Sequence, residues 1–400
     1  MQIYKIFVIS DLGSMILEKY HSSGYYCKFV IFATSFMKMV RIHIILLSVL
    51  LTGMGCFAQT GGHSVYNFLS YSYASRVTAL GSGLISVYDD DPTLLMVNPS
   101  FIGARHSNTL ALDFTNYFAN TNYASALYSY TFPKAGSFAI EARYVNYGKF
   151  TGTDESGVET GSFSVNDVAL TVGWGRELSP HFSIGADLKL VYCGYEMYHS
   201  FGLAVDVAGS YFNKEKNLSL TLLAKNIGTE VKPFYPGNLE RLPFDLQFAL
   251  SQRLAHVPIR YHISLHSLYR WNMNYYGADN PFMESDALTN ELLYPSKTSQ
   301  FFDNFFRHII FGLEIEPSKY FSIQLAYNHN IHQEMKVLAR HSMAGFSYGF
   351  MLNIKGLRFG FSRLQYAPGA APNCVNLALN FEEISQWKKK DNPKKLERMP

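Results

Sequence analysis

The chain has 400 residues, 48% of them hydrophobic and only 16% charged, so it has enough apolar side chains for a large core and is not composed like a disordered protein. Its formal net charge of +3 is too small to indicate nucleic acid as a partner, and no arginine-rich stripe supports one. The 28 Tyr and 31 Phe are interleaved with polar residues, which is not the profile of a helical membrane protein.

A secretory signal precedes the bulk of the chain. It begins with the basic residues Lys38 and Arg41, continues with an apolar run, and ends in Cys-Phe-Ala before Gln59, a small-x-small cleavage pattern. We therefore expect residues 37–58 to be a signal peptide that directs the protein out of the cytoplasm.

Residues 1–36 lie upstream of this complete signal, an arrangement that signal peptides do not normally tolerate. We interpret them as an N-terminal extension that results from a start codon assigned too early, with Met37 or Met39 as the true initiator. Cys56 leaves lipidation open as an alternative to simple cleavage, although Gly53 stands where a lipobox has Leu.

Three carboxylates are packed against a proline in "VYDDDPTLLMVNPSFIG", residues 87–103. Adjacent Asp residues could chelate a hard cation or share a proton in an acid/base site. The alternative is structural, because Asp91 is a good N-cap before a proline, and Asn98 caps a second turn that begins at Pro99 and can end at Gly103. The oxygen-ligand alternation of an EF-hand is absent, which favours two capped turns.

From residue 107 onward the pattern alternates with period two. Ile184, Leu188 and Leu190, for example, alternate with Asp187 and Lys189, so the segment has one apolar and one polar face. Most of the segments have about ten residues or more, enough to cross a bilayer when tilted. We predict fourteen strands, near 107–117, 122–132, 136–149, 163–177, 182–197, 201–213, 217–228, 244–255, 259–271, 306–316, 321–331, 344–354, 357–367 and 374–383.

The connections between these segments alternate in length. Tight ones such as "PKAG", "SPH", "NKEK" and "IKG" are followed by long ones such as "TGTDESGVETGS" and the segment 272–305. Short turns at one rim and long loops at the other are typical of an outer-membrane barrel. The sequence therefore predicts an all-β, transmembrane antiparallel β-barrel over residues 107–383, with extracellular long loops, periplasmic termini and a polar, basic periplasmic tail at 384–400.

Three further motifs are weak indications of chemistry. "GFSYG" matches the G-x-S-x-G of esterases, but Ser347 lies inside an alternating strand instead of at a strand-to-helix turn. His262 and His266 share the inward parity of one strand, where a metal site is the alternative to ordinary polar lumen residues. Cys193 and Cys374 lie on strands too far apart for a disulfide bond. We predict no catalytic residue, metal or cofactor.

The segment 61–103 resembles the N-terminal signature of the FadL-like PorV/PorQ family of outer-membrane proteins of Bacteroidetes. Further matches are "LLAKNIG", "LPFDLQFALSQRLAHVPIRYHISLHSLYRW", "RHIIFGLEI" and "LAYNHN", so the likeness covers nearly all of the mature chain; Ser100 departs from it, because Ala is usual there. The signature residues are Val65 to Leu69, Ala74, Arg76, Ala79 to Gly81, Asp89 to Asp91 and Asn98 to Ser100.

The resemblance implies a fourteen-stranded barrel whose N-terminal segment, residues 59–106, folds into the lumen as a small helical hatch. It also implies a non-enzymatic role in the type IX secretion system. Such a barrel tethers a PorZ-like surface protein within a complex that includes the sortase PorU and its partner PorV. That complex links secreted cargo to anionic lipopolysaccharide. A FadL-type transporter of hydrophobic small molecules is the alternative.

Two groups of residues follow as candidates. In the hatch we expect structural roles for Arg76, Asp89, Asp90, Asp91, Asn98 and Pro99. The surplus carboxylates Asp89 and Asp90 need cations, which Arg76 or the inward Arg143, Lys189 or Arg260 could supply. For a partner, the long segment 272–305 offers four amphipathic side chains, unless it only shields the barrel mouth. These side chains are Tyr275, Tyr276, Phe282 and Tyr294.

Overall fold

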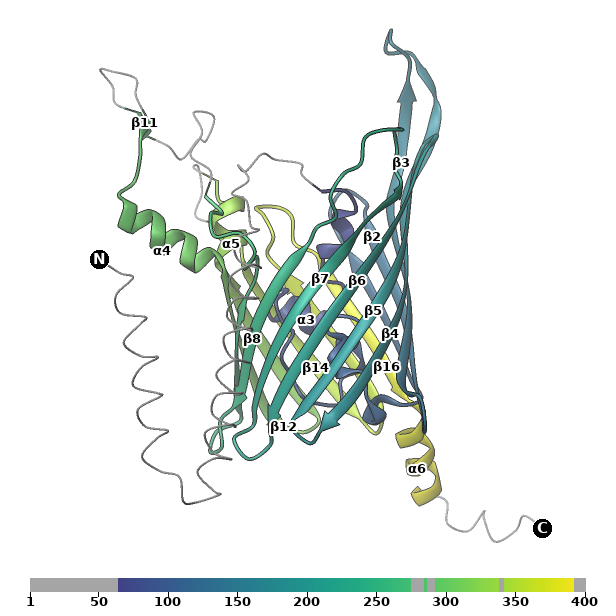
Figure 1. Ribbon diagram of the computed structural model, residues 1–400, viewed down its shortest axis with the longest axis vertical. Coiled ribbons are helices and arrows are strands. Elements are labelled where there is room, and N and C mark those ends of the chain that lie inside the picture. The colour runs from purple at the N-terminus through teal and green to yellow at the C-terminus, as the bar shows by residue number, and fades with distance from the viewer. Residues whose placement is uncertain (1–63, 275–283, 286–291, 338–341, 392–400) are drawn as a thin grey trace, which may run out of the picture. The chain divides into compact units, whose positions relative to one another are not determined.

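Fourteen antiparallel strands close into a single barrel in the computed structural model, which describes residues 64–274, 284–285, 292–337 and 342–391. The predicted fold class is therefore confirmed (Figure 1). The barrel strands are β1 (Thr109–Asn116), β2 (Asn122–Phe132), β3 (Gly136–Thr153), β4 (Glu159–Ser179), β5 (Phe182–Tyr195), β6 (Tyr198–Asn213), β7 (Leu218–Lys232), β8 (Asp245–Arg253), β9 (Ile259–Leu265), β12 (Ile309–Ser318), β13 (Phe321–Asn328), β14 (Phe346–Ile354), β15 (Leu357–Leu364) and β16 (Asn373–Asn380).

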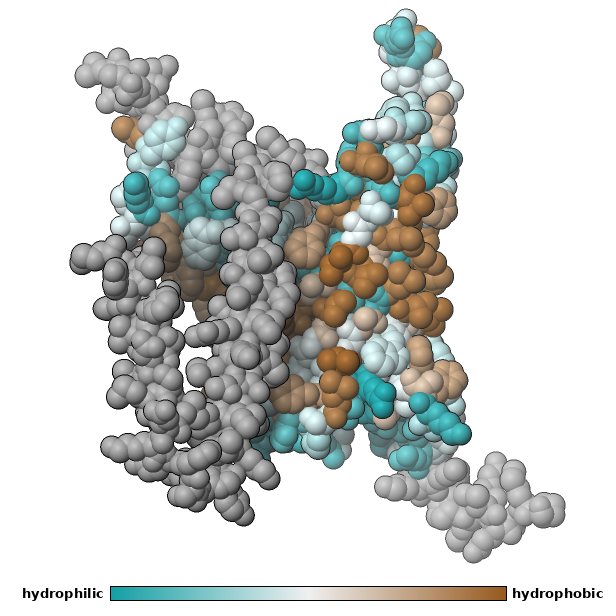
Figure 2. All heavy atoms as spheres, in the orientation of Figure 1, coloured by the Kyte–Doolittle hydropathy of each residue, from teal (hydrophilic) through white to brown (hydrophobic). Residues whose placement is uncertain are grey.

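The barrel is polar inside and apolar outside, the reverse of a water-soluble protein. On β5 the exposed Leu188 and Leu190 face outward, while the alternating Asp187 and Lys189 are buried in the lumen. Figure 2 shows apolar side chains across the outer face of the strands in view and hydrophilic ones towards both rims. Because only a lipid environment favours such an outer face, the barrel is built to span a membrane.

The two rims differ as the sequence predicts, with short turns at the end where β16 finishes and longer connections at the other end. Some predicted boundaries are wrong. The expected loop "TGTDESGVETGS" is mostly strand, because β3 and β4 continue as a hairpin in which Phe150 stacks on Phe163. The strand expected over 321–331 stops at Asn328, whose side chain accepts from Ile331 N at 3.2 Å and so caps α5 (His329–Met335).

Besides α5, two further helices and a small hairpin of the described chain lie outside the barrel wall. The long-loop rim carries β10 (Glu284–Ser285), β11 (Leu292–Leu293) and α4 (Lys297–Arg307). At the other rim α6 (Phe381–Asp391) begins within the expected last strand and tail, because Asn380 accepts from the backbone N–H groups of Glu382 and Glu383, both at 3.1 Å. No helix among the described residues is long and apolar enough to cross a bilayer.

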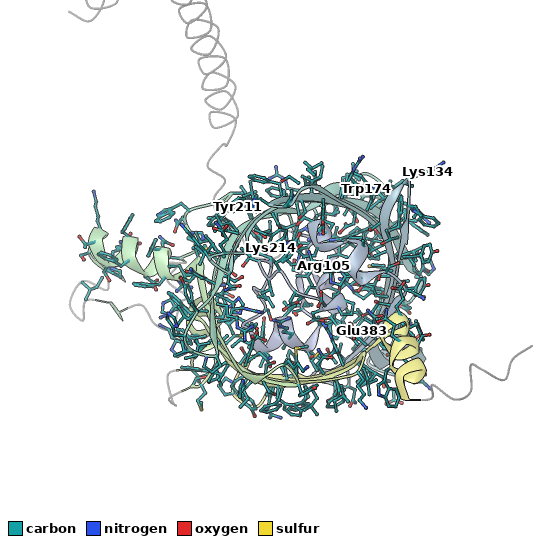
Figure 3. The ribbon with its side chains drawn as sticks, turned by 90° about the horizontal axis from the view of Figure 1, so that it is seen from below. Arg105, Lys134, Trp174, Tyr211, Lys214 and Glu383 are labelled. Carbon is teal, nitrogen blue, oxygen red and sulfur yellow. The ribbon has the colours of Figure 1, made fainter. Side chains whose placement is uncertain are left out.

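The lumen is filled by the segment before β1. It consists of short turns joined by extended chain: η1 (Asn67–Ser70), α3 (Ser75–Ala79), η2 (Pro92–Leu94), η3 (Pro99–Phe101) and η4 (Ala104–His106). Viewed along the barrel axis, this segment lies within the ring of strands (Figure 3). We call residues 64–106 the hatch. Its apolar side chains, including the fully buried Leu84 and Leu95, form the main core of the molecule.

Candidate functional site

The two capped turns predicted from the sequence are present in the hatch, each as a single 3-10 turn. The side chain of Asp91 accepts from Thr93 N at 3.1 Å, and that of Asn98 accepts from Ser100 N at 3.0 Å. Both caps satisfy backbone donors that are buried from water. The second turn ends earlier than predicted, since Gly103 is extended and precedes η4 instead of closing η3.

Glycines in the barrel wall allow the η3 end of the hatch to approach the strands closely. Gly175 on β4 and Gly185 on β5 are direct partners across the sheet. A Cβ at either position would lie within 3.0 Å of the backbone of Pro99, and real Cβ atoms essentially never come so close. Ser210 on β6 completes the contact with Ser100 Oγ at 2.6 Å. The hatch backbone therefore packs directly on this wall.

Helix α3 docks on the opposite side of the barrel, which β14, β15 and β16 form. Ser75 donates to the side-chain oxygen of Asn376 at 2.7 Å, and a Cβ on Gly349 would meet Ala79 at 2.7 Å. Ser347 donates to Ala79 O at 2.9 Å, so the serine of "GFSYG" lies in β14 and holds the hatch. The hatch thus bridges two opposite walls of the lumen.

A buried ion-pair network ties the centre of the hatch to a third part of the wall. Arg76 on α3 contacts Asp89 at 2.7 Å, Asp91 at 3.2 Å and Glu314 of β12 at 2.7 Å. Arg260 of β9 contacts both Asp89 and Glu314 at 3.1 Å. Arg76, Asp91 and Glu314 are almost completely buried. Each of these charges therefore depends on the others for its compensation.

Only two of the four cations expected to pair with Asp89 and Asp90 belong to this network. Arg76 and Arg260 pair with Asp89, whereas Arg143 pairs with Glu141 at 3.0 Å and Lys189 with Asp206 at 2.5 Å. The expectation that Asp90 needs a buried cation is wrong, because this side chain is exposed and water can solvate it. Sequence reasoning missed Glu314, although an inward carboxylate in the apolar "RHIIFGLEIEP" was a signal for a buried partner.

The other candidate residues take up separate positions in the lumen. His262 is buried 3.9 Å from Glu314, while the Nδ1 atom of His266 lies 3.1 Å from Ser267 Oγ. Cys193 and Cys374 are both free thiols. Within the described parts of the chain, no group of three or more His, Cys, Asp and Glu side chains is placed to hold a metal ion.

His106 at the end of the hatch gives a prediction for pH. Its Nε2 atom lies 3.1 Å from Asp89 O, and burial, helped by Arg105, lowers its pKa from 6.5 to about 3. Because the folded protein keeps this imidazole neutral, its contribution to stability is complete above pH 6.5 and is lost as the pH falls towards 3. We expect the hatch to become more accessible to protease between pH 7 and pH 5, and His106→Gln to reduce that dependence.

The control for this measurement is His256→Gln, which removes an exposed imidazole in the β8–β9 turn. It should leave the pH dependence of proteolysis as in the unaltered protein. Equal pH profiles for His106→Gln and the unaltered protein would contradict the assignment.

Above the hatch, at the long-loop rim, lies a cavity of about 650 Å³. The start of the hatch forms its floor, and its walls come from the upper ends of the strands and the loops β1–β2, β7–β8 and β15–β16. We call this space the mouth cavity. Most of its lining side chains are aromatic: Tyr66, Phe68, Tyr71, Tyr117, Phe118, Tyr123, Tyr147, Tyr195, Tyr198, Phe234, Tyr235 and Tyr366. Sequence reasoning missed it, because its residues come from seven separate segments.

The expected partner-binding residues cannot all be placed. Tyr275, Tyr276 and Phe282 lie outside the described residues. Tyr294 precedes α4 and is 61% exposed. Helix α4 adds exposed phenylalanines that the sequence analysis did not single out, Phe301 and Phe302 among them. The described end of the segment 272–305, from Tyr294 into α4, thus carries exposed aromatic side chains.

Comparison with known proteins gives structural likenesses only. No protein-family model matches the chain, and no curated protein sequence matches it. The solved structure of the toluene transporter TodX of Pseudomonas putida is similar, with 12% identity, a TM-score of 0.45, and coverage of 79% of this chain and 98% of that one. A FadL homologue of Pseudomonas aeruginosa has 8% identity, a TM-score of 0.43, and coverage of 80% and 100%.

Proposed function

We propose that this protein is a plugged outer-membrane barrel that anchors a surface protein of the type IX secretion system, as PorQ does. The observation that carries the proposal is the docking of the hatch on opposite walls, with glycines where any side chain would collide with it. A lumen filled in this way favours a scaffold over a conduit, and the sequence resemblance given above indicates which scaffold.

In this proposal the long-loop rim faces the cell exterior and both termini face the periplasm. The partner is a PorZ-like surface protein, and through it the sortase PorU and the barrel PorV, which process cargo and join it to anionic lipopolysaccharide. The chain itself is not an enzyme, since the serine of its one hydrolase-like motif, Ser347, is engaged with the hatch backbone. Outer-membrane lipid surrounds the apolar outer wall.

The test is co-purification in mild detergent from cells that produce the protein with a tag. An anchor is expected to retain its surface partner in stoichiometric amount, whereas a barrel that purifies alone would contradict the proposal. Replacing residues 277–294 with a Gly-Ser segment of equal length should release the partner, because it removes Tyr294 and leaves α4 with its N-cap Ser296.

A matched loop exchange controls for general disturbance of the rim. Replacing residues 154–158, the tip of the β3–β4 hairpin, with Gly-Ser residues should leave partner retention unchanged. Both variants should still form a heat-modifiable barrel. Undiminished retention after the 277–294 exchange would exclude that segment as the partner interface.

A transporter of small hydrophobic molecules is the second candidate, and the aromatic mouth cavity is the observation that favours it. Uptake of a labelled apolar compound into proteoliposomes separates the two functions. The anchor proposal expects no uptake above that of empty liposomes. Saturable uptake, together with purification of the barrel without a partner, would favour the transporter.

A further inference from the structure

Two groups of aromatic rings in contact line the mouth cavity. In one group Tyr71 lies within ring-stacking distance of Tyr117 and Tyr123, with centroids 6.0 and 6.1 Å apart. In the other group Tyr195 stacks on Phe234 at 5.0 Å. Aromatic rings from both groups line the space of the cavity. Aromatic rings attract cations, apolar groups and sugar rings.

Carboxylates lie behind this aromatic lining. Asp167 is buried beneath Tyr147 and Tyr195, whose hydroxyl groups donate to it at 2.6 and 3.4 Å. Glu230 is also buried and accepts from Ser200 Oγ at 3.0 Å; Ser200 in turn contacts the hydroxyl of Tyr66. Hydrogen bonds from tyrosine to a carboxylate increase the electron density on the ring, which strengthens its attraction for a cation.

No cationic side chain balances these charges within the lining. The residues around the cavity, all of which the structure describes, include Asp167, Glu230 and Glu240 but no Lys, Arg or His. The donors that satisfy the two buried carboxylates are hydroxyl groups and the backbone N–H of Glu240, all neutral. The site therefore has a negative potential, which repels an anion such as a fatty-acid carboxylate.

We propose that the mouth cavity binds an organic cation, the guanidinium or ammonium group of an arginine or lysine side chain or of a small amine. Its volume of about 650 Å³ accommodates such a side chain with its neighbours. The rings supply cation–π contacts and the carboxylates behind them supply the charge. The inference is independent of whether the barrel is an anchor or a transporter. In either case it specifies that the bound group is positively charged.

Calorimetric titration of the purified protein with arginine amide, laurate and glucose tests the proposal. Arginine amide is expected to bind, to bind more weakly as sodium chloride is raised, and to bind at least tenfold more weakly to Asp167→Asn. Glu240→Gln, at an exposed position on the rim of the cavity, should weaken it about threefold. Glu155→Gln, an exposed carboxylate outside the cavity, is the matched control and should change nothing.

The outcomes separate the ligand classes. Tighter binding of laurate or of glucose than of arginine amide would overturn the proposal, as would the absence of binding by all three or an unchanged affinity in Asp167→Asn. Heat-modifiability shows whether Asp167→Asn folds. If that variant does not fold, the affinities of Glu240→Gln and Tyr235→Ala, both at exposed positions, test the proposal instead. Arginine amide that binds both variants as tightly as the unaltered protein would also overturn the proposal.

Discussion

Replacing Gly185 with leucine is expected to detach the η3 end of the hatch and open the barrel to ions. The position faces the lumen, and a side chain there would occupy the space of the Pro99 backbone, which no rotamer change can vacate. Overpacking of this kind typically costs about 1–3 kcal/mol, and a leucine against backbone lies at the upper end or beyond it. Planar-bilayer recordings should show conductance, and protease should cut the hatch.

Gly209→Leu is the matched control for this change. Gly209 lies on the neighbouring strand β6, next to the outward-facing Val207, and an added Cβ would meet nothing within 4 Å. A leucine there should face lipid and leave the barrel closed. If Gly185→Leu were also closed and protease-resistant, the hatch could not be packed on this wall as described.

Arg76→Ala is expected to destabilise the hatch by about 3–5 kcal/mol, the usual cost of removing one partner from a buried ion-pair network. The change leaves Glu314 and Asp91 buried, with Arg260 able to contact only the first of them. The measurement is the free energy of unfolding in denaturant, together with protease accessibility of the hatch. Both should report a weakened hatch inside an intact barrel.

Two further variants identify the cause of the Arg76→Ala effect. The double variant Arg76→Ala/Glu314→Gln should lose less stability than Arg76→Ala alone, because no uncompensated charge then remains at Glu314. Arg176→Ala removes an exposed arginine and should change stability by less than about 0.5 kcal/mol. A loss in Arg76→Ala no larger than in Arg176→Ala would show that the network does not hold the hatch.

The barrel itself was predictable because its physical signal is local. A strand that separates lipid from lumen must alternate, and residues such as Leu188 and Lys189 display that alternation within a few positions. The two hatch turns were predictable for the same reason, since an N-cap followed by proline is a signal of two residues. Both Asp91 and Asn98 cap as expected.

The pairings across the lumen were not predictable, because they depend on the path of the hatch. Arg76 reaches Glu314 over a separation of 238 residues, and nothing near either position specifies the other. The ends of the strands were missed where polar side chains start helices, as Asn328 and Asn380 do. Those caps were readable in principle, but the alternating pattern continues through them and favoured longer strands.

Conductance of the unaltered protein in planar lipid bilayers, beside a variant that lacks residues 64–106, tests directly whether the hatch closes the barrel. We expect no steady conductance from the unaltered protein and large steps from the variant, because the hatch that bridges the lumen is then absent. Steady open-channel steps from the unaltered protein, equal to those of the variant, would contradict the claim that the hatch closes the barrel.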